Sequence, residues 1–205
     1  MIFRRVFGAT LLACLFFGSL GGSASATGLG TMPLGAATKQ PFGHYSLCRR
    51  DPAQCRVEPG PAAAPAALDL PLMRLVAGIN RDVNRSIAPE SDQTLYGVEE
   101  RWTLPTLSRG DCEDYALLKR RRLHDAGVPY GDLLMTVVRK RDGTGHAVLT
   151  LRTQAGDFVL DNLDDRVRPW AEVPYRFIKR QSSADPARWV EIETDAEPIV
   201  SALSR

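Results

Sequence analysis

The sequence predicts an α+β fold in which N-terminal helices pack on an antiparallel sheet. Between residues 68 and 127, apolar side chains recur at helical spacing, and after Gly127 they alternate with a period of two. Short turn signals separate the alternating runs. Helices followed by a meander of strands favour α+β over alternating βα units. With 205 residues, 44% of them hydrophobic, we expect one ordinary domain with additional sequence at its ends.

Residues 1–26 have the pattern of a secretory signal peptide. Arg4 and Arg5 precede an apolar run from Val6 to Leu20, and Ala24-Ser25-Ala26 fits a small-x-small cleavage site. The apolar run is short for a membrane span. We therefore expect an exported, periplasmic protein, and Leu11 to Cys14 leaves open a lipid anchor through Cys14.

The charge balance gives no reason to expect a nucleic-acid partner. The formal net charge is +2, and residues 1–26 contribute two arginines and no acid. The remainder carries 24 basic and 24 acidic residues. A neutral chain lacks the basic excess typical of nucleic-acid binding.

Residues 27–67 read as an irregular N-terminal segment that ends in a Pro/Ala-rich linker from residue 57. Cys48 and Cys55 bracket a turn signal at Asp51-Pro52, so in an oxidising compartment we expect a local disulfide. Metal binding by this pair is the disfavoured alternative, because no second cysteine pair stands close in the sequence. The pairing leaves Cys112 as an odd thiol, a candidate for reactivity.

Two helices are predicted. The first runs from about residue 68 to Ser86, before Pro89, and the second begins at Cys112 and stops at Gly127 and Pro129. Their apolar positions are Leu72, Leu75, Val76, Ile79 and Val83 in the first, and Ala116, Leu117, Leu118 and Leu123 in the second. Lys119-Arg120-Arg121-Arg122 in the second helix reads as a solvated face, although a basic run can also dock an acidic partner or a phospholipid surface.

Three short strands are predicted at Leu133–Arg139, His146–Thr153 and Phe158–Leu163, and a fourth at Tyr175–Lys179. Asp142-Gly143 and Ala155-Gly156 supply hairpin turns between the first three.

Cys112 is the first candidate for chemistry. A thiol at a helix N-terminus is favoured as thiolate by the positive end of the macrodipole, and a thiolate attacks carbonyl carbon. Asp111 is a plausible N-cap, and Asp114 can reach back as in a capping box. The alternative is a cysteine that merely packs in the core.

His146 and Asp161 are the candidate partners of Cys112. A two-residue turn at Ala155-Gly156 pairs positions whose numbers sum to 311, so Asp161 opposes Thr150. Thr150 shares a face with His146, because strand side chains alternate. Imidazole can then take the thiol proton, with the carboxylate orienting the ring. His44, in the irregular segment, and His124, near a helix C-terminus, are weaker candidates.

Three blocks of sequence together resemble the bacterial transglutaminase-like cysteine proteinases, which include LapG-type periplasmic proteases. The blocks are Gly110–Ala116 with Lys119, Gly145–Leu149 and Val159–Leu163, and the Cys48…Cys55 segment and Trp102 also resemble the family's upstream pattern. The resemblance implies a papain-like, transglutaminase-like core over residues 68–205. It also implies Cys112 as nucleophile, His146 as base and Asp161 as orienting carboxylate.

The resemblance further implies a calcium site at Asp111 and Glu113. Carboxylate oxygens suit Ca²⁺, and two side chains need further ligands, such as Asp114 or backbone carbonyls. Helix capping is the alternative explanation of these acids. LapG-type members also suggest a cell-surface adhesin as substrate and an inner-membrane receptor as regulator.

The sequence therefore predicts an exported cysteine peptidase that cleaves a protein substrate through a thioester. Two alternatives stay open: transglutaminase-type or cell-wall amide acyl transfer by the same triad, and a non-catalytic periplasmic binding module.

Overall fold

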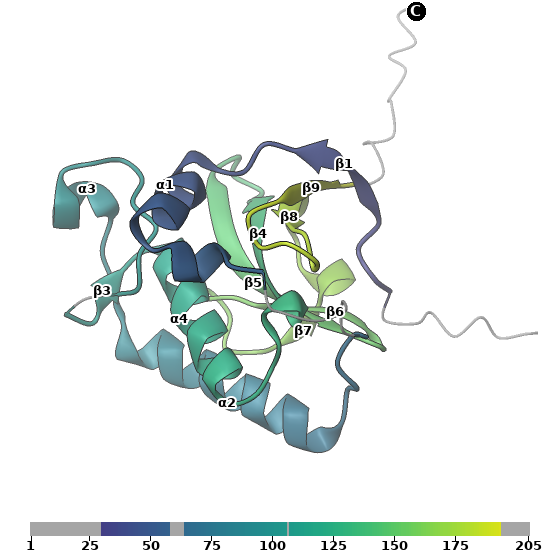
Figure 1. Ribbon diagram of the computed structural model, residues 1–205. Helices are drawn as coiled ribbons and strands as arrows, with labels where there is room; N and C mark the ends of the chain where they lie inside the picture. Colours follow the sequence, from purple (N-terminus) through teal and green to yellow (C-terminus); the bar gives the residue numbers. More distant parts are fainter. Residues whose placement is uncertain (1–29, 58–63, 106, 194–205) are drawn as a thin grey trace, which may run out of the picture.

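The computed structural model describes residues 30–57, 64–105 and 107–193 (Figure 1). The predicted signal peptide, Cys14 and much of the Pro/Ala linker lie outside the described residues. Within the described ranges, no helix combines the length and the apolar character that crossing a membrane requires.

A seven-stranded sheet forms the centre of the protein, with strand order β1-β9-β8-β4-β5-β6-β7 and antiparallel pairing throughout. Its strands are β1 (Leu34–Thr38), β4 (Leu133–Arg139), β5 (Gly145–Thr153), β6 (Gly156–Leu160), β7 (Arg168–Pro169), β8 (Arg176–Gln181) and β9 (Trp189–Ile192). A separate two-stranded parallel ladder joins β2 (Ala88–Pro89) to β3 (Arg109–Gly110).

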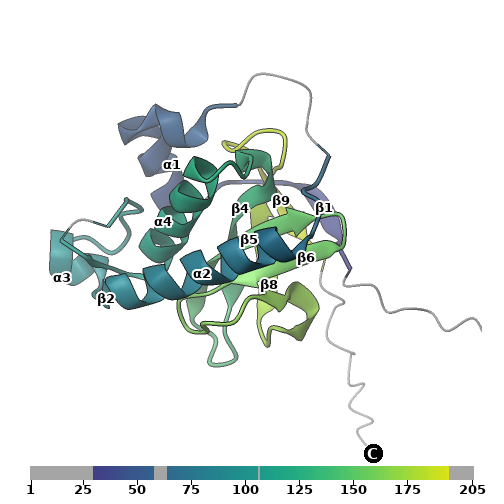
Figure 2. The same cartoon turned by 90° about the horizontal axis from the view of Figure 1, so that it is seen from below.

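The helices are α1 (Phe42–Arg50), α2 (Leu70–Ser86), α3 (Asp92–Tyr96) and α4 (Cys112–Asp125), with 3₁₀ turns at Pro52–Cys55, Tyr130–Asp132 and Trp170–Glu172. Figures 1 and 2 show α2 and α4 next to each other, and α4 packs on β4 and β5. The main core fills the space between these layers, from Val76 of α2 and Leu117 of α4 to Leu149 of β5. The predicted α+β class is confirmed.

Local signals explain both long helices. The Asp69 carboxylate accepts a hydrogen bond from the backbone N–H of Leu72 (2.8 Å), and Pro71 occupies the first turn of α2. The α2 stripe of Val76 and Val83 is fully buried. The helix at Cys112 begins where predicted and ends at Asp125, two residues before Gly127, whose φ is +99°.

The prediction that residues 27–67 are irregular is wrong for part of that segment. β1 and α1 lie within it, and β1 pairs with β9 at the edge of the main sheet. The domain therefore begins well before residue 68. The pairing joins segments about 150 residues apart and could not be read from local periodicity. The predicted Cys48–Cys55 disulfide is present at the end of α1.

The β5–β6 hairpin carries the two predicted partners of Cys112. Its paired numbers sum to 309, as in Leu149 with Leu160, so the turn lies one position earlier than predicted and each residue's partner shifts by two. A shift of two preserves side-chain alternation, and His146 and Asp161 still share a face. Asp161 follows the last residue of β6 instead of lying inside the strand.

The basic run on α4 is only partly a solvated face. Arg122 is exposed, whereas Lys119 and Arg120 are buried. The guanidinium of Arg120 donates to the carbonyls of Leu133 (3.0 Å) and Gln54 (3.3 Å) and lies over the ring of Tyr130. The sequence did not predict the burial of Lys119 and Arg120, because a run of charged residues is usually exposed.

Candidate active site

Cys112 is the first residue of α4 and lines a cleft of about 480 Å³. Its Sγ lies 3.4 Å from the backbone N–H of Ala147, and the thiol donates to Glu113 Oε2 at 3.2 Å. The same cleft is lined by His146, Ala147, Trp102, Phe42 and Lys179. Helix α4 and strand β5 thus bring Cys112 and His146 to one cavity.

His146 and Asp161 form a buried hydrogen-bonded pair. Nε2 of His146 lies 2.9 Å from Oδ1 of Asp161, and both side chains are about 5% exposed. Since the ring uses Nε2 toward the carboxylate, Nδ1 is the nitrogen that can accept the thiol proton. This is the predicted pairing of the base with its orienting acid.

Asp161 receives two further hydrogen bonds. The backbone N–H of Leu163 donates to Oδ1 (3.0 Å), and the Tyr175 hydroxyl donates to Oδ2 (2.7 Å). Burial by itself raises the pKa of Asp161, but the hydrogen bond and charge of His146, with those two donors, hold the pKa below its ordinary value. Asp161 is therefore kept ionised.

Sequence reasoning missed Tyr175. Its ring also meets the His146 ring edge-on, with centroids 5.6 Å apart. The residue appeared only as the start of a predicted strand, and β8 begins one residue later, at Arg176. Fourteen residues separate Tyr175 from Asp161, and no sequence spacing predicts how the intervening loop returns.

A second polar cluster includes the two residues that flank Cys112 in the sequence. Carboxylate oxygens of Asp92, Asp111 and Glu113 all lie within 4.8 Å of one another. The parallel β2–β3 ladder explains this meeting, because β2 leads directly into α3 and β3 leads directly into Asp111. Asp92 was not predicted, since it precedes Asp111 by 19 residues and resembles an ordinary first-turn acid after Ser91.

Asp111 is the N-cap residue of α4, as predicted, but the predicted capping hydrogen bond of its side chain is not present. Its carboxylate accepts instead from the backbone N–H of Asp92 (3.3 Å). Asp114 accepts from the backbone N–H of Thr103 (3.0 Å). Both carboxylates are directed toward other segments.

A family model for the bacterial transglutaminase-like cysteine proteinases matches residues 34–197, about four fifths of the chain. The chain belongs to this family. The match includes β1 and α1, in agreement with the early start of the domain.

Solved structures of Legionella pneumophila LapG share the fold of this family member. One LapG structure has 22% identity and a TM-score of 0.50, covering 58% of this chain and 69% of LapG. The calcium-bound form of LapG has 20% identity and a TM-score of 0.49, covering 60% of this chain and 73% of LapG. The EGTA-treated form has 22% identity and a TM-score of 0.48, covering 55% of this chain and 64% of LapG. The chain thus spans about two thirds of the LapG chains it matches. No curated protein sequence matches it.

The environment of the proteinase's Cys112 opposes the thiolate. Burial is the largest influence and raises the thiol pKa, and the charge of Glu113 raises it further. The helix-dipole argument from the sequence points the other way. Burial decides the direction of the pKa shift here, and the Glu113 carboxylate in contact with the sulfur adds to it.

The negative charges of the carboxylate cluster are not balanced by hydrogen-bond donors among the described residues. Burial raises the pKa of Glu113, of Asp92 and of Asp114, that of Asp114 to about 8, and the charge of Asp111 adds to each shift. Oxygen atoms Asp92 Oδ1, Asp111 Oδ1 and Asp114 Oδ2 are buried and have no hydrogen-bond partner among the described residues. Several unpaired hard oxygens around one point fit a calcium ion.

Gly110 allows the side chain of Asp114 to lie close to the backbone at position 110. A Cβ built on this residue would lie 2.5 Å from Asp114 Oδ2 and 2.8 Å from Asp114 Cβ. Any side chain at position 110 would therefore push Asp114 away from Asp111.

The other two histidines are structural. His44 is buried between Trp102 and Trp189, and burial, followed by the charge of Arg120, lowers its pKa to about 3. Its imidazole lies near Cys48 and Cys55, but their sulfurs form a disulfide and are not available as thiolate ligands. His124 stacks on the Tyr130 ring with centroids 3.6 Å apart.

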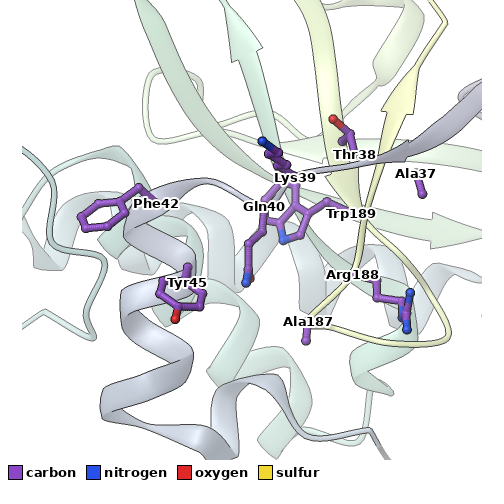
Figure 3. A pocket seen from close by; sticks show the side chains of 9 residues that line it. All are labelled: Ala37, Thr38, Lys39, Gln40, Phe42, Tyr45, Ala187, Arg188 and Trp189. Carbon is purple, nitrogen blue, oxygen red and sulfur yellow. The ribbon is translucent and has the colours of Figure 1, made fainter.

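A second hollow of about 480 Å³ is lined by residues of β1, α1 and β9 (Figure 3). Phe42 lines both cavities, and its side chain is 75% exposed. Tyr45 of α1 and Trp189 of β9 form other parts of the second hollow. Phe42 thus contributes to the lining of both cavities.

Proposed function

We propose that this protein is an exported cysteine peptidase that cleaves peptide bonds of a protein substrate through a thioester intermediate. The observation that carries the proposal is the buried hydrogen bond between His146 and Asp161 at the cleft that Cys112 lines. Family membership supports it, since the family is one of cysteine proteinases.

Each residue then has a defined step. His146 Nδ1 takes the proton of Cys112, and the thiolate attacks the substrate carbonyl carbon. The backbone N–H of Cys112, at the start of α4, helps to hold the oxyanion. His146 returns the proton to the leaving amine, and water then hydrolyses the thioester. Asp161, fixed by Leu163 and Tyr175, orients the imidazole and stabilises its protonated form.

Calcium is part of the proposal. Asp92, Asp111 and Glu113 would hold the ion, with Asp114 as a further candidate ligand. Bound Ca²⁺ supplies positive charge that neutralises the cluster. Glu113 then no longer presents an uncompensated charge to the sulfur, which removes the main local obstacle to the thiolate after burial itself.

Location and partners rest on the sequence. The pattern of residues 1–26 supports a periplasmic location, and the Cys48–Cys55 disulfide agrees with an oxidising compartment. The sequence resemblance to LapG-type proteases supports a cell-surface adhesin as substrate and an inner-membrane receptor as regulator.

The test is the rate of Cys112 alkylation by iodoacetamide as a function of pH, with and without calcium, in wild type and His146→Ala. An ordinary thiol titrates near about 8.5, whereas activated cysteines titrate at roughly 3.5–7.5. We expect rapid labelling below about pH 8 in calcium, much slower labelling in EGTA, and loss of activation in His146→Ala.

His124→Ala is the matched control, because His124 lies outside the cleft and stacks on Tyr130. Peptide mass spectrometry assigns the label to Cys112, and products of casein digestion separate hydrolysis from amide exchange. Ordinary reactivity of Cys112 in the folded calcium-loaded protein, unchanged by His146→Ala, would contradict the proposal and favour a binding module.

A further inference from the structure

Two asparagines of α2 bind the loop that begins with Asp161. The side-chain amide nitrogen of Asn84 donates hydrogen bonds to the backbone carbonyl of Asp161 (3.0 Å) and to Oδ1 of Asp165 (2.9 Å). One turn earlier on the helix, Asn80 donates to the backbone carbonyl of Asp164 (3.0 Å). All three acceptors are oxygen atoms, so the amide nitrogen of each asparagine is the atom that faces the loop. Helix α2 therefore holds the loop at residues 161, 164 and 165.

Asn84 connects the two ends of this loop. An amide NH₂ group can donate two hydrogen bonds, and Asn84 has an acceptor for each, on the first residue of the loop and on the residue four positions later. Inside the loop, the backbone N–H of Leu163 donates to Oδ1 of Asp161 (3.0 Å). The backbone of Asp161 is thus held by the helix, while the loop itself holds its carboxylate.

The backbone position of Asp161 matters because its carboxylate has two further partners. Oδ1 lies 2.9 Å from Nε2 of His146, and the Tyr175 hydroxyl donates to Oδ2 at 2.7 Å. Hydrogen bonds weaken as their length and angle depart from the preferred values. A shift of the backbone at position 161 would move the carboxylate relative to both partners at once.

Asparagine is an unfavourable residue at both positions of α2. It forms helices less readily than leucine or alanine. Asn80 lies between Val76 and Val83 in the sequence, and all three are 0% exposed. The Oδ1 atoms of Asn80 and Asn84 are buried and have no hydrogen-bond partner in the part of the chain that the structure describes. Such oxygens lower stability, so an apolar side chain would suit the helix better. What the asparagines add is the set of hydrogen bonds to the loop.

We propose that Asn84 is a positioning residue, which holds the backbone of Asp161 so that the Asp161 carboxylate stays in line with Nε2 of His146. Asn80 supports the same loop three residues further along. The inference rests on the proposed function, in which Asp161 orients His146, and it assigns part of that task to α2. Asn84 acts on the imidazole through Asp161.

The test observes the ring N–H proton of His146 by NMR in Asn84→Ala. This proton lies on Nε2 when Asp161 accepts it, and His146→Ala assigns its signal among the three histidines. In Asn84→Ala, we expect the signal to move upfield and the proton to exchange faster with water, because its hydrogen bond to the carboxylate becomes weaker. The indole N–H signals of Trp102 and Trp189, whose hydrogen bonds involve other residues, should stay in place and report an intact fold.

The rate of Cys112 alkylation by iodoacetamide in calcium, near neutral pH, gives a second measurement. A displaced Asp161 stabilises protonated His146 less, so the thiol loses its proton less readily. We expect Asn84→Ala to slow alkylation about fivefold, the effect of one ordinary hydrogen bond. Asp165→Asn keeps an acceptor oxygen for Asn84 and should change neither measurement, which excludes an effect of the Asp165 charge.

Val76→Ala is the control for a general loss of stability. It removes buried packing of α2 about two turns before Asn84 and should lower the melting temperature at least as much as Asn84→Ala does. The His146 signal and the alkylation rate should nevertheless keep their wild-type values. Arg85→Ala, an exposed neighbour of Asn84, controls for a change of the helix surface. Asn84→Leu, which keeps the branched shape, repeats the test where alanine does not fold.

A folded Asn84→Ala or Asn84→Leu protein that keeps the wild-type His146 signal overturns the inference, whatever its alkylation rate. So does an unchanged alkylation rate in these variants when Cys112 is activated in wild type. A Val76→Ala protein whose His146 signal moves as far as that of Asn84→Ala also overturns it, because the effect then follows stability alone. An unactivated Cys112 in wild type overturns the proposed function instead, and the His146 signal then still decides whether Asn84 positions Asp161.

Discussion

The two polar regions near Cys112, the His146–Asp161 pair and the carboxylate cluster of Asp92, Asp111 and Glu113, differ in how their buried carboxylates are satisfied. Both bury carboxylates. Asp161 has both oxygens hydrogen-bonded, to His146 and Leu163 on one side and to Tyr175 on the other. The cluster around Asp111 instead contains buried oxygens without hydrogen-bond partners in the described part of the chain.

The difference shows that donors, and not burial alone, decide the charge of a buried acid. The pKa of Asp161 lies below its ordinary value, whereas burial and the charges of Asp111 and Asp92 raise that of Asp114 to about 8, although Thr103 donates one hydrogen bond to it. One region is completed by groups of the protein itself. In our proposal, the other is completed by a calcium ion.

Breaking the first region should give the largest effect. Asp161→Asn keeps the size of the side chain but removes the charge that stabilises protonated His146. We expect Cys112 alkylation in calcium near neutral pH to slow by roughly 10²-fold, within the range of a lost acid–base partner. Asp125→Asn, at the exposed end of α4, serves as the control. A rate within a factor of about two of wild type would remove Asp161 from the catalytic group.

The second largest effect should be a pH dependence of stability that arises from the carboxylate cluster around Asp111. Its acids have raised pKa values in the folded protein, so the folded state retains protons that the unfolded chain has already lost. Without calcium, the free energy of unfolding should therefore fall as pH rises from about 4 to about 8. Calcium at about a hundred times its dissociation constant should restore about 2.7 kcal/mol.

Urea unfolding at several pH values, in EGTA and in calcium, measures both parts of this prediction. Asp92→Asn should flatten the pH dependence and weaken the stabilisation by calcium. Asp82→Asn, an exposed acid of α2, should change neither. A stability that does not respond to calcium in wild type would mean that the cluster is stable without a metal ion.

Tyr175→Phe should give the smallest effect and sharpen the comparison. It removes one of three hydrogen bonds to Asp161 and keeps the ring contact with His146. We expect alkylation to slow about tenfold below neutral pH, since a hydrogen bond to a charged group contributes about 1.5 kcal/mol. The exposed Tyr45→Phe is the control. A loss as large as that of Asp161→Asn would show that Tyr175 does more than donate this hydrogen bond.

Local sequence signals predicted what depends on neighbouring residues. Strand β4 and the start of α4 were correct to the residue, and His146 and Asp161 were placed on one face although the predicted pairing register was wrong by two residues. That error was harmless only because it was even. An error of one would have separated the pair.

The features that the sequence did not predict depend mostly on contacts between segments that are distant in the chain. Asp92 reaches Asp111 through a ladder of two-residue strands, which is too short to produce a periodic pattern. Tyr175 reaches Asp161 through an irregular loop. Lys119 was assigned to the surface by its charge, although its helical position relative to Cys112 already placed it on the buried face.

The pairing of β1 with β9 has a consequence for how the cleft is assembled. Pro41, Phe42 and Gly43 line the cleft and follow closely after β1, whose partner strand is the last one described. Contacts between such distant parts of a chain form slowly, because a long loop must close first. We therefore expect the wall of the cleft to be fixed late in folding. A nascent or partly folded chain would then carry Cys112 without the surface that, in the proposed function, orients a substrate.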